Sequence, residues 1–211
     1  WIPLGALAGA LAGVAAFVFL EVLDRITDAR TDDGWLVWLL PVGGLVVGLA
    51  YHHLGGRARG GNSLLLDEIH DPVDWVPRRM APLVLAGTWL THLVGGSAGR
   101  EGTGLQMAGS LADLASRTLG LRADDRRRML VAGLAGGFGA VFGVPAAGAV
   151  FALEVQGVGR VRHESIVPAL AASVTGDLVV RALGHQHVVP VVRSVPEHSA
   201  WLDLRVAVAG V

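Results

Sequence analysis

The stretch GGSAGREGTG, residues 95–104, decides the fold because it places two charges inside a long apolar region. Arg100 and Glu101 are the only Asp, Glu, Lys or Arg residues between Met80 and Ala112. A charged pair at membrane depth costs several kcal/mol unless it is paired or faces water. The five glycines of the stretch let the backbone bend there. The stretch therefore predicts a broken membrane helix with a functional site at the break.

Long uncharged stretches on both sides of this segment indicate an integral membrane protein. The chain has 211 residues, of which 52% are hydrophobic and 17% charged. About 20 apolar residues span a bilayer core. Four uncharged stretches approach that length: Trp1–Leu20, Gly34–Tyr51, Met80–Gly99 and Met129–Leu153. Three shorter runs are predicted to be half-helices or tilted segments of the kind that surround transporter substrates: Gly102–Ala112, Ser165–Gly176 and Ala182–Val192.

The charged residues exclude several classes of protein and suggest an orientation. A net charge of −1 argues against nucleic-acid binding. The absence of cysteine excludes thiolate chemistry, and the absence of lysine excludes P-loop and Schiff-base mechanisms. The basic pairs and triplets at Arg57, Arg59 and Arg126–Arg128 are predicted to be cytoplasmic. The acidic segment Asp24–Asp33 is predicted to be a linker on the other side.

Glu101 is the strongest candidate for chemistry. Backbone N–H groups at the start of the helix after the glycines can point into a cavity, where the helix N-terminus attracts an anion. The Glu101 carboxylate could occupy such a site itself, and its protonation would free the site for a transported anion. This hypothesis couples protons to anions. The alternative is an interfacial turn in which Arg100 and Glu101 merely end two helices.

Two further breaks flank this segment. GGNSLLLDE, residues 60–68, predicts a second helix that begins after glycines, with Asn62 as its N-cap. Pro145 interrupts the apolar run around Phe142 and Gly143. Glycines spaced four residues apart at Gly5, Gly9 and Gly13 predict close helix packing.

The motifs together resemble those of the CLC family of chloride channels and proton-coupled antiporters. The residues that carry the resemblance are Gly99-Arg100-Glu101-Gly102, then Gln106, then FGVPAAGAVF at 142–151, and Glu154. Their order and spacing match along roughly residues 57–160. The resemblance implies an all-α membrane fold of broken, tilted helices and an anion pathway in each subunit of a homodimer. No cofactor is expected.

The resemblance also assigns roles to residues. Glu101 would gate the pathway and carry protons, and Asn62 aligns with the anion-contacting serine of the family. The N–H groups of Gly102 and Thr103 would donate to chloride or fluoride. The remaining assignments are Gly99 and Arg100 in the anion-binding loop, with Arg100 anchoring it, and Phe142, Gly143 and Pro145 in a pore-helix motif.

Three positions depart from the usual family pattern. Thr103 replaces a proline, Asn62 replaces the serine, and Val155 stands where chloride antiporters have an inner proton-feeding glutamate. These changes resemble the bacterial fluoride/proton antiporter clade, which implies a bacterial inner-membrane location. The family's unit is two inverted repeats, and we expect residues 1–189 to form the first repeat. Residues 190–200 would connect it to the start of the second at 201–211, and the rest of the second half would be a missing partner.

Three other functions remain open. A passive chloride channel of the same family would use the same residues. A metal-dependent membrane enzyme would gather Asp67, Glu68, His70 and Asp71, although no His pair lies on one helix face. We expect these side chains to be solvated at the membrane interface instead. A helix-packing subunit would use the glycine faces and have no ion flux.

Overall fold

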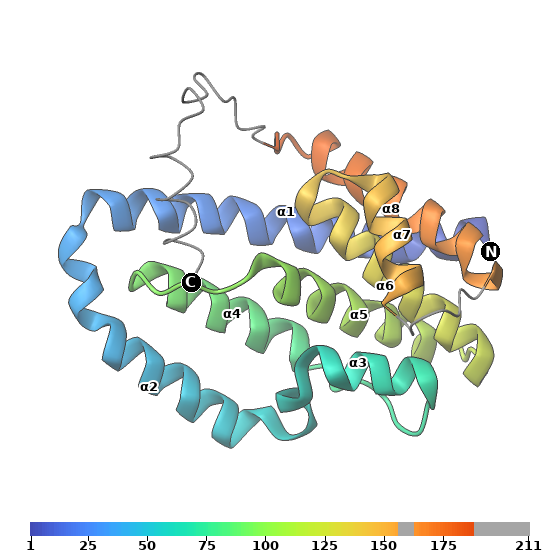
Figure 1. The fold of residues 1–211 in the computed structure, drawn as a ribbon, viewed down its shortest axis with the longest axis horizontal. Coiled ribbons are helices and arrows are strands. Elements are labelled where there is room, and N and C mark those ends of the chain that lie inside the picture. The colour runs from blue at the N-terminus through green and yellow to red at the C-terminus, as the bar shows by residue number, and fades with distance from the viewer. Residues whose placement is uncertain (156–162, 188–211) are drawn as a thin grey trace, which may run out of the picture.

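A computed structural model describes residues 1–155 and 163–187, which form a bundle of helices (Figure 1). No strand occurs in these two ranges. The α-helices are α1 (Ile2–Asp32), α2 (Leu40–Ala50), α3 (Gly61–His70), α4 (Met80–Leu93), α5 (Arg100–Thr118), α6 (Ala123–Phe142), α7 (Pro145–Glu154) and α8 (Ile166–Ala182). Short 3-10 or π turns at Gly34–Leu39, Tyr51–Gly55, Gly56–Gly60 and His163–Ser165 connect or extend them. The predicted loop at 190–200 and the predicted repeat start at 201–211 lie outside the described residues.

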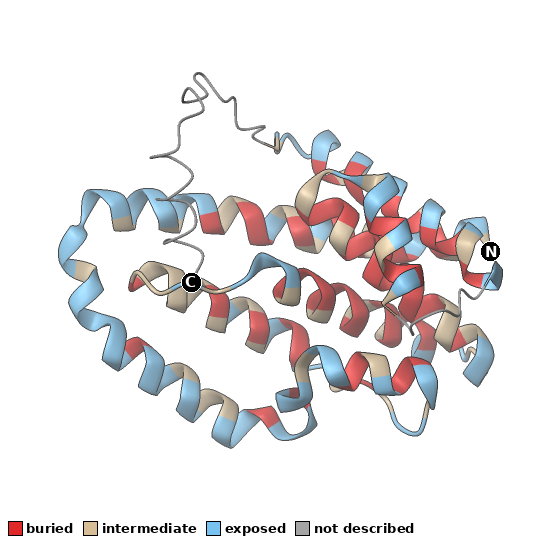
Figure 2. Cartoon of the chain, viewed as in Figure 1, coloured by how far each residue is buried: buried red, intermediate tan, exposed pale blue. Residues whose placement is uncertain are grey.

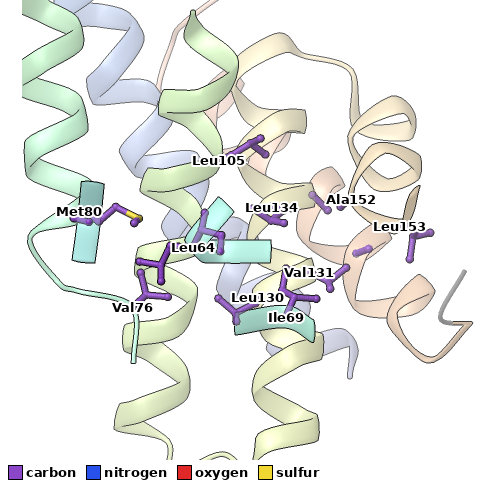
Figure 3. Packing of buried hydrophobic residues seen from close by; sticks show 14 residues of the cluster. Leu64, Ile69, Val76, Met80, Leu105, Leu130, Val131, Leu134, Ala152 and Leu153 are labelled. Atoms are coloured by element: carbon purple, nitrogen blue, oxygen red, sulfur yellow. The ribbon is translucent and has the colours of Figure 1, made fainter. Parts of the chain in front are cut away.

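Helix α6 forms the centre of the bundle and packs against α1, α5, α7 and α8. Figure 2 shows buried residues concentrated where these helices meet, whereas α2 is exposed along most of its length. A hydrophobic cluster joins α3 to α5, α6 and α7 (Figure 3). This cluster fixes α3 against the bundle, even though α3 is only 10 residues long.

The glycines of α1 permit a close crossing with α8, as the sequence predicts. A Cβ on Gly5 would lie 2.5 Å from the Pro168 carbonyl oxygen, and a Cβ on Gly13 would lie 2.7 Å from the Gly176 oxygen. A Cβ on Gly9 would overlap the backbone of Ala172. Real side chains do not approach backbone atoms this closely, so these positions require glycine.

Several predicted element boundaries are wrong. The expected linker Asp24–Asp33 is mostly helical, since α1 continues to Asp32. A helix can extend beyond the apolar core into water, where its Asp and Arg side chains are solvated. The expected span Gly34–Tyr51 is a 3-10 turn followed by α2, and the helical run continues to His70.

Two of the three short uncharged runs belong to helices that are longer than the expected half-helices. The run Gly102–Ala112 lies within the 19-residue α5, and Ser165–Gly176 lies in the run His163–Ala182. The third short run, Ala182–Val192, begins where α8 ends at Ala182, and its residues 183–187 are not helical. The predicted span Met80–Gly99 contains only the 14-residue α4. The break before Pro145 is confirmed, because α6 ends at Phe142 and α7 begins at Pro145.

Within the described residues, three helical runs are long and apolar enough to cross a membrane: Ile2–Asp32, Gly34–His70 and His163–Ala182. The first and third are each 44% buried within the bundle over their most apolar window, and the second is 6% buried. The bundle therefore has both a packed interior and an apolar exterior.

Candidate functional site: two helix starts at one cavity

Helix α5 begins directly after the glycine-rich stretch. Gly99 is its N-cap with an extended backbone, and Arg100 is its first residue. Glu101 follows in the first turn and is exposed. The N–H groups of the first turn have no carbonyl partner within the helix. The α5 N-terminus therefore offers backbone donors and a partial positive charge beside the Glu101 carboxylate.

Helix α3 begins beside the start of α5. A Cβ placed on Gly102 would lie 3.6 Å from Asn62 Nδ2 and 3.7 Å from Gln106 Nε2. Gly61 has a φ of +55°, and its Cβ would lie 3.4 Å from the same Gln106 nitrogen. The positive φ of Gly61 favours glycine there, and the distances around Gly102 show that the two helix starts and the two side-chain amides lie close together.

Asn62 is not the N-cap that the sequence predicts. Gly60 occupies the cap position, and Asn62 is the second residue of α3 with no side-chain capping bond. The 3-10 turn that ends at Gly60 runs directly into α3, and the positive φ of Gly61 makes the turn before Asn62 without a capping side chain. The Asn62 amide is thereby left exposed and free to take another partner.

A cavity of about 250 Å³ lies between these helix starts. Its polar lining comes from Asn62, Glu101 and the backbone of Gly102. The other lining residues are apolar and come from α3, α5, α6 and the end of α7: Leu65, Leu66, Leu105, Leu134, Phe151 and Val155. Leu105 and Leu134 are visible in the neighbouring packed cluster (Figure 3). Charge interactions are stronger in such an apolar surrounding than in water.

Thr103 and Arg100 do not line this cavity. The Thr103 side chain is buried, and its hydroxyl lies 2.7 Å from the Thr88 hydroxyl of α4. Arg100 lines a second hollow of about 280 Å³ together with Asp24, Phe142 and His187 among others. The structure therefore gives the Thr103 hydroxyl a hydrogen bond inside the bundle and places Arg100 at a different hollow from Asn62.

The predicted pore-helix motif is also separate from the cavity. Phe142 lies at the end of α6, and Gly143 ends that helix with a φ of +67° close to the His187 ring. Pro145 is the first residue of α7. The opposite end of α7, at Phe151 and Val155, reaches the cavity. The motif thus orients α7, while none of its three predicted residues lines the site.

A buried ionic network lies at the other end of α3. Arg126 of α6 contacts Asp113 at 2.5 Å and Glu68 at 3.1 Å, and Arg57 contacts Glu68 at 2.6 Å. The side chains of Arg126, Asp113 and Glu68 are between 1% and 6% exposed. Asp113 also accepts a hydrogen bond from the Val76 N–H at 2.7 Å. The network joins α3, the α3–α4 connector, α5 and α6.

This network overturns the predicted environment of Glu68, which is buried and salt-bridged instead of solvated with Asp67, His70 and Asp71. No cluster of three potential metal ligands was found in the described parts of the chain. Sequence reasoning missed Asp113 and Arg126 as partners. The signal that could have found them was Asp113 itself, the only acidic residue of α5 besides Glu101.

The helical architecture and the paired helix starts define an all-α membrane-type protein built from broken helices around a small, mainly apolar cavity with polar groups at the helix starts. The chain belongs to the CLC family: the family model described as voltage gated chloride channel matches residues 43–211. The all-helical CLC-type fold that the sequence predicts is confirmed.

Relatives of known name agree with this family. A chloride/fluoride channel protein of Pseudomonas syringae pv. tomato is 46% identical over the whole chain, which spans 47% of that relative. The H(+)/Cl(−) exchange transporter ClcA of Vibrio parahaemolyticus is 28% identical over 95% of the chain and 47% of the relative. The chain thus spans about half the length of the curated relatives it matches.

Solved structures give the same result. The crystal structure of a CLC-type fluoride/proton antiporter superposes with a TM-score of 0.85 at 30% identity, covering 98% of this chain and 52% of that one. A slow cyanobacterial Cl−/H+ antiporter superposes with a TM-score of 0.61 at 18% identity, which shows the shared fold.

Proposed function

We propose that this chain forms the first half of a transmembrane anion transporter that exchanges fluoride or chloride for protons, with Glu101 as the gate and proton carrier. The observation that carries the proposal is the position of Glu101 in the first turn of α5, at the cavity that Asn62 and Gly102 also line. The names of the relatives support anion transport and proton exchange.

The geometry suggests how one carboxylate serves both ions. When ionised, Glu101 can itself accept hydrogen bonds from the free N–H groups at the α5 start and from the Asn62 amide. An anion competes for the same donors. Protonation removes the Glu101 charge, so the donors become free to bind the anion while the proton is carried on the carboxyl. Among the described residues that line the cavity, Glu101 is the only one with a carboxyl group.

Fluoride selectivity is the finer part of the proposal. Asn62 supplies an exposed amide N–H₂ at the position where the family's chloride members have a serine, and it lies close to Gly102 and the Gln106 amide. A 30% identical structure with a TM-score of 0.85 is a fluoride/proton antiporter. The complete unit would contain a second half, assemble as a homodimer and reside in a bacterial inner membrane.

The test uses the complete transporter in liposomes, with fluoride and chloride efflux measured by ion-selective electrodes while pH is recorded. We expect Glu101→Gln, which mimics the protonated side chain, to keep anion flux and to abolish proton movement. The matched control is Glu164→Gln, an exposed glutamate in the turn before α8 that does not line the cavity. The control should retain both fluxes.

Three results would contradict the proposal at different levels. Unchanged anion flux and proton coupling in both Glu101→Gln and Glu101→Ala would remove Glu101 from the mechanism. Anion flux without proton movement in the unmodified protein would favour the passive channel. Equal fluoride and chloride rates would remove the selectivity while leaving the exchange mechanism intact.

A further inference from the structure

The α3–α4 connector and the end of α5 line an open hollow of about 490 Å³, outside the Glu101 cavity. Three arginines line it: Arg78 and Arg79 before α4, and Arg117 in the last turn of α5. All three are exposed, and none forms an ion pair with any residue in the described ranges. Three arginines that form no ion pair within the described ranges therefore line one surface depression.

The acidic residue that lines the hollow and those of the adjacent buried network are already engaged. Asp74, the carboxylate that lines the hollow, contacts Arg57 at 2.8 Å, and Glu68 and Asp113 are held by Arg126 within the buried network. The charge of the three lining arginines is therefore not neutralised from within this part of the protein. An anionic ligand would supply the missing partner, and arginine is well suited to bind phosphate oxygens in pairs.

The surface around the hollow has a mixed apolar and basic character. The Trp75 ring lies near two guanidinium groups, with the Arg126 carbon at 4.7 Å and the Arg117 carbon at 5.7 Å from its centroid. Val73 of the same connector is 80% exposed, and Leu119 after α5 is 50% exposed. Tryptophan and arginine beside exposed aliphatic side chains are typical of the membrane–water interface.

The connector is also held in place before any ligand binds. The Val76 N–H donates to Asp113, the Asp74 N–H donates to Glu68 at 3.2 Å, and Arg126 donates to the Asp74 carbonyl at 2.8 Å. A preordered loop loses little conformational freedom on binding. The hollow is thus a formed surface feature. It lies at the basic end of the bundle, which carries Arg57 and Arg126 beside Trp75.

We propose that this hollow binds the phosphate headgroup of an anionic phospholipid. Arg78, Arg79 and Arg117 contact the phosphate, while Trp75 and Val73 lie against the glycerol and upper acyl region. The basic end of the bundle faces the cytoplasm under the positive-inside rule, where anionic lipids attract basic segments. This inference does not depend on the transported ion.

The test measures the thermal unfolding midpoint of the complete detergent-solubilised transporter with added phosphatidylglycerol, phosphatidylcholine or inorganic phosphate. We expect phosphatidylglycerol to raise the midpoint of the unmodified protein and phosphatidylcholine to leave it unchanged. The variant R78Q/R79Q/R117Q should lose the increase. The control R25Q/R122Q removes exposed arginines elsewhere without leaving a buried acid unpaired and should keep it.

A second readout covers the case in which the triple variant folds poorly. Native mass spectrometry of the single variant Arg117→Gln should show fewer bound phosphatidylglycerol molecules than the unmodified protein. The proposal is overturned if the arginine variants respond to phosphatidylglycerol as the unmodified protein does. It is also overturned if inorganic phosphate alone gives the full increase, because the hollow then binds a soluble anion.

Discussion

Arg126 is a buried cation whose charge is balanced by two carboxylates. Asp113 contacts its Nε and Glu68 contacts its Nη1, and its other terminal nitrogen donates to the Asp74 carbonyl. A buried ion pair contributes little net stability compared with an apolar pair, but removing one partner leaves an uncompensated charge. Asp113 is thus expected to be much more sensitive to substitution than the surface acids of α6.

Asp113→Asn should destabilise the protein by about 1.5–3 kcal/mol, because Arg126 would lose a buried charge-assisted hydrogen bond while Glu68 still balances its charge. The matched control is Asp124→Asn, whose side chain is 78% exposed and pairs with Arg127 on the surface. The control should cost less than about 1 kcal/mol. Denaturant unfolding followed by tryptophan fluorescence measures both. Equal midpoints for the two variants would show that the buried pair is not a stability determinant.

Gly143 is required by its backbone conformation and by its neighbour. Its φ is +67°, and a Cβ there would lie 2.7 Å from the His187 ring. Gly143→Ala should therefore cost roughly 1–2 kcal/mol for the left-handed backbone and a further amount for displacing His187. Gly120→Ala is the matched control, since Gly120 has a φ of +63° with open space around it. Thermal unfolding should rank Gly143→Ala as the less stable variant. The reverse order would contradict the His187 contact.

The crossing of α1 and α8 depends on glycine in the same way. Gly9 faces the Ala172 backbone so closely that a Cβ would overlap it. Gly9→Ala should force the two helices apart and destabilise the bundle by about 1–3 kcal/mol.

Gly44→Ala provides the comparison for this crossing. Gly44 lies inside α2, and no neighbouring atom lies within 4 Å of the point that an alanine Cβ would occupy. Alanine there should stabilise the helix by roughly 0.5–1 kcal/mol. Both variants are measured by denaturant unfolding of the detergent-solubilised protein. A neutral Gly9→Ala would show that α1 and α8 can separate at little cost.

Local sequence patterns predicted the helices and the cavity better than the helix ends. The glycine-rich segment, the proline and the uncharged stretches correctly located the helix breaks before Glu101 and at Pro145. Asn62, Glu101 and Gly102 line one cavity. The predicted end of the first helix before Asp24–Asp33 is wrong, because charged residues do not stop a helix once it leaves the apolar core. Whether Glu101 gates ion movement stays a prediction.

The buried network could not be predicted because its members are far apart in sequence. Arg126 lies 13 residues from Asp113 and 58 from Glu68. No periodicity within one helix links such positions, and the pairing appears only when α3, α5 and α6 are packed. The assignment of Phe142, Gly143 and Pro145 to a pore-helix motif stays a prediction: Phe142 lines the hollow that Arg100 lines, and the far end of α7 reaches the Glu101 cavity.

The bundle exposes a broad apolar exterior. Trp38, Val42 and Leu45 of the second helical run are 82%, 56% and 62% exposed. On α8 the exposed residues Val167, Leu170, Val174 and Leu178 follow the spacing of one helix face. Exposed apolar area of this kind is stable in contact with lipid or with further protein.

The chain should therefore remain with the membrane fraction when expressing cells are lysed and the membranes are washed with alkaline carbonate. Detergent should release it. In water the apolar exterior would be exposed to solvent, which is unfavourable, so a soluble monomer is not expected. Recovery of the folded chain in the carbonate supernatant would contradict a membrane-spanning arrangement.

The position of Arg126 has a consequence for the order in which the protein matures during synthesis. Glu68 and Arg57 emerge from the ribosome well before Arg126, which completes the network around them. Until α6 has been made, α3 lacks the buried cation and most of the apolar surface that holds it. The Asn62 end of α3 can therefore take its place beside Glu101 only after α5 and α6 have entered the bundle, so the cavity forms late in biogenesis and not as each helix is inserted.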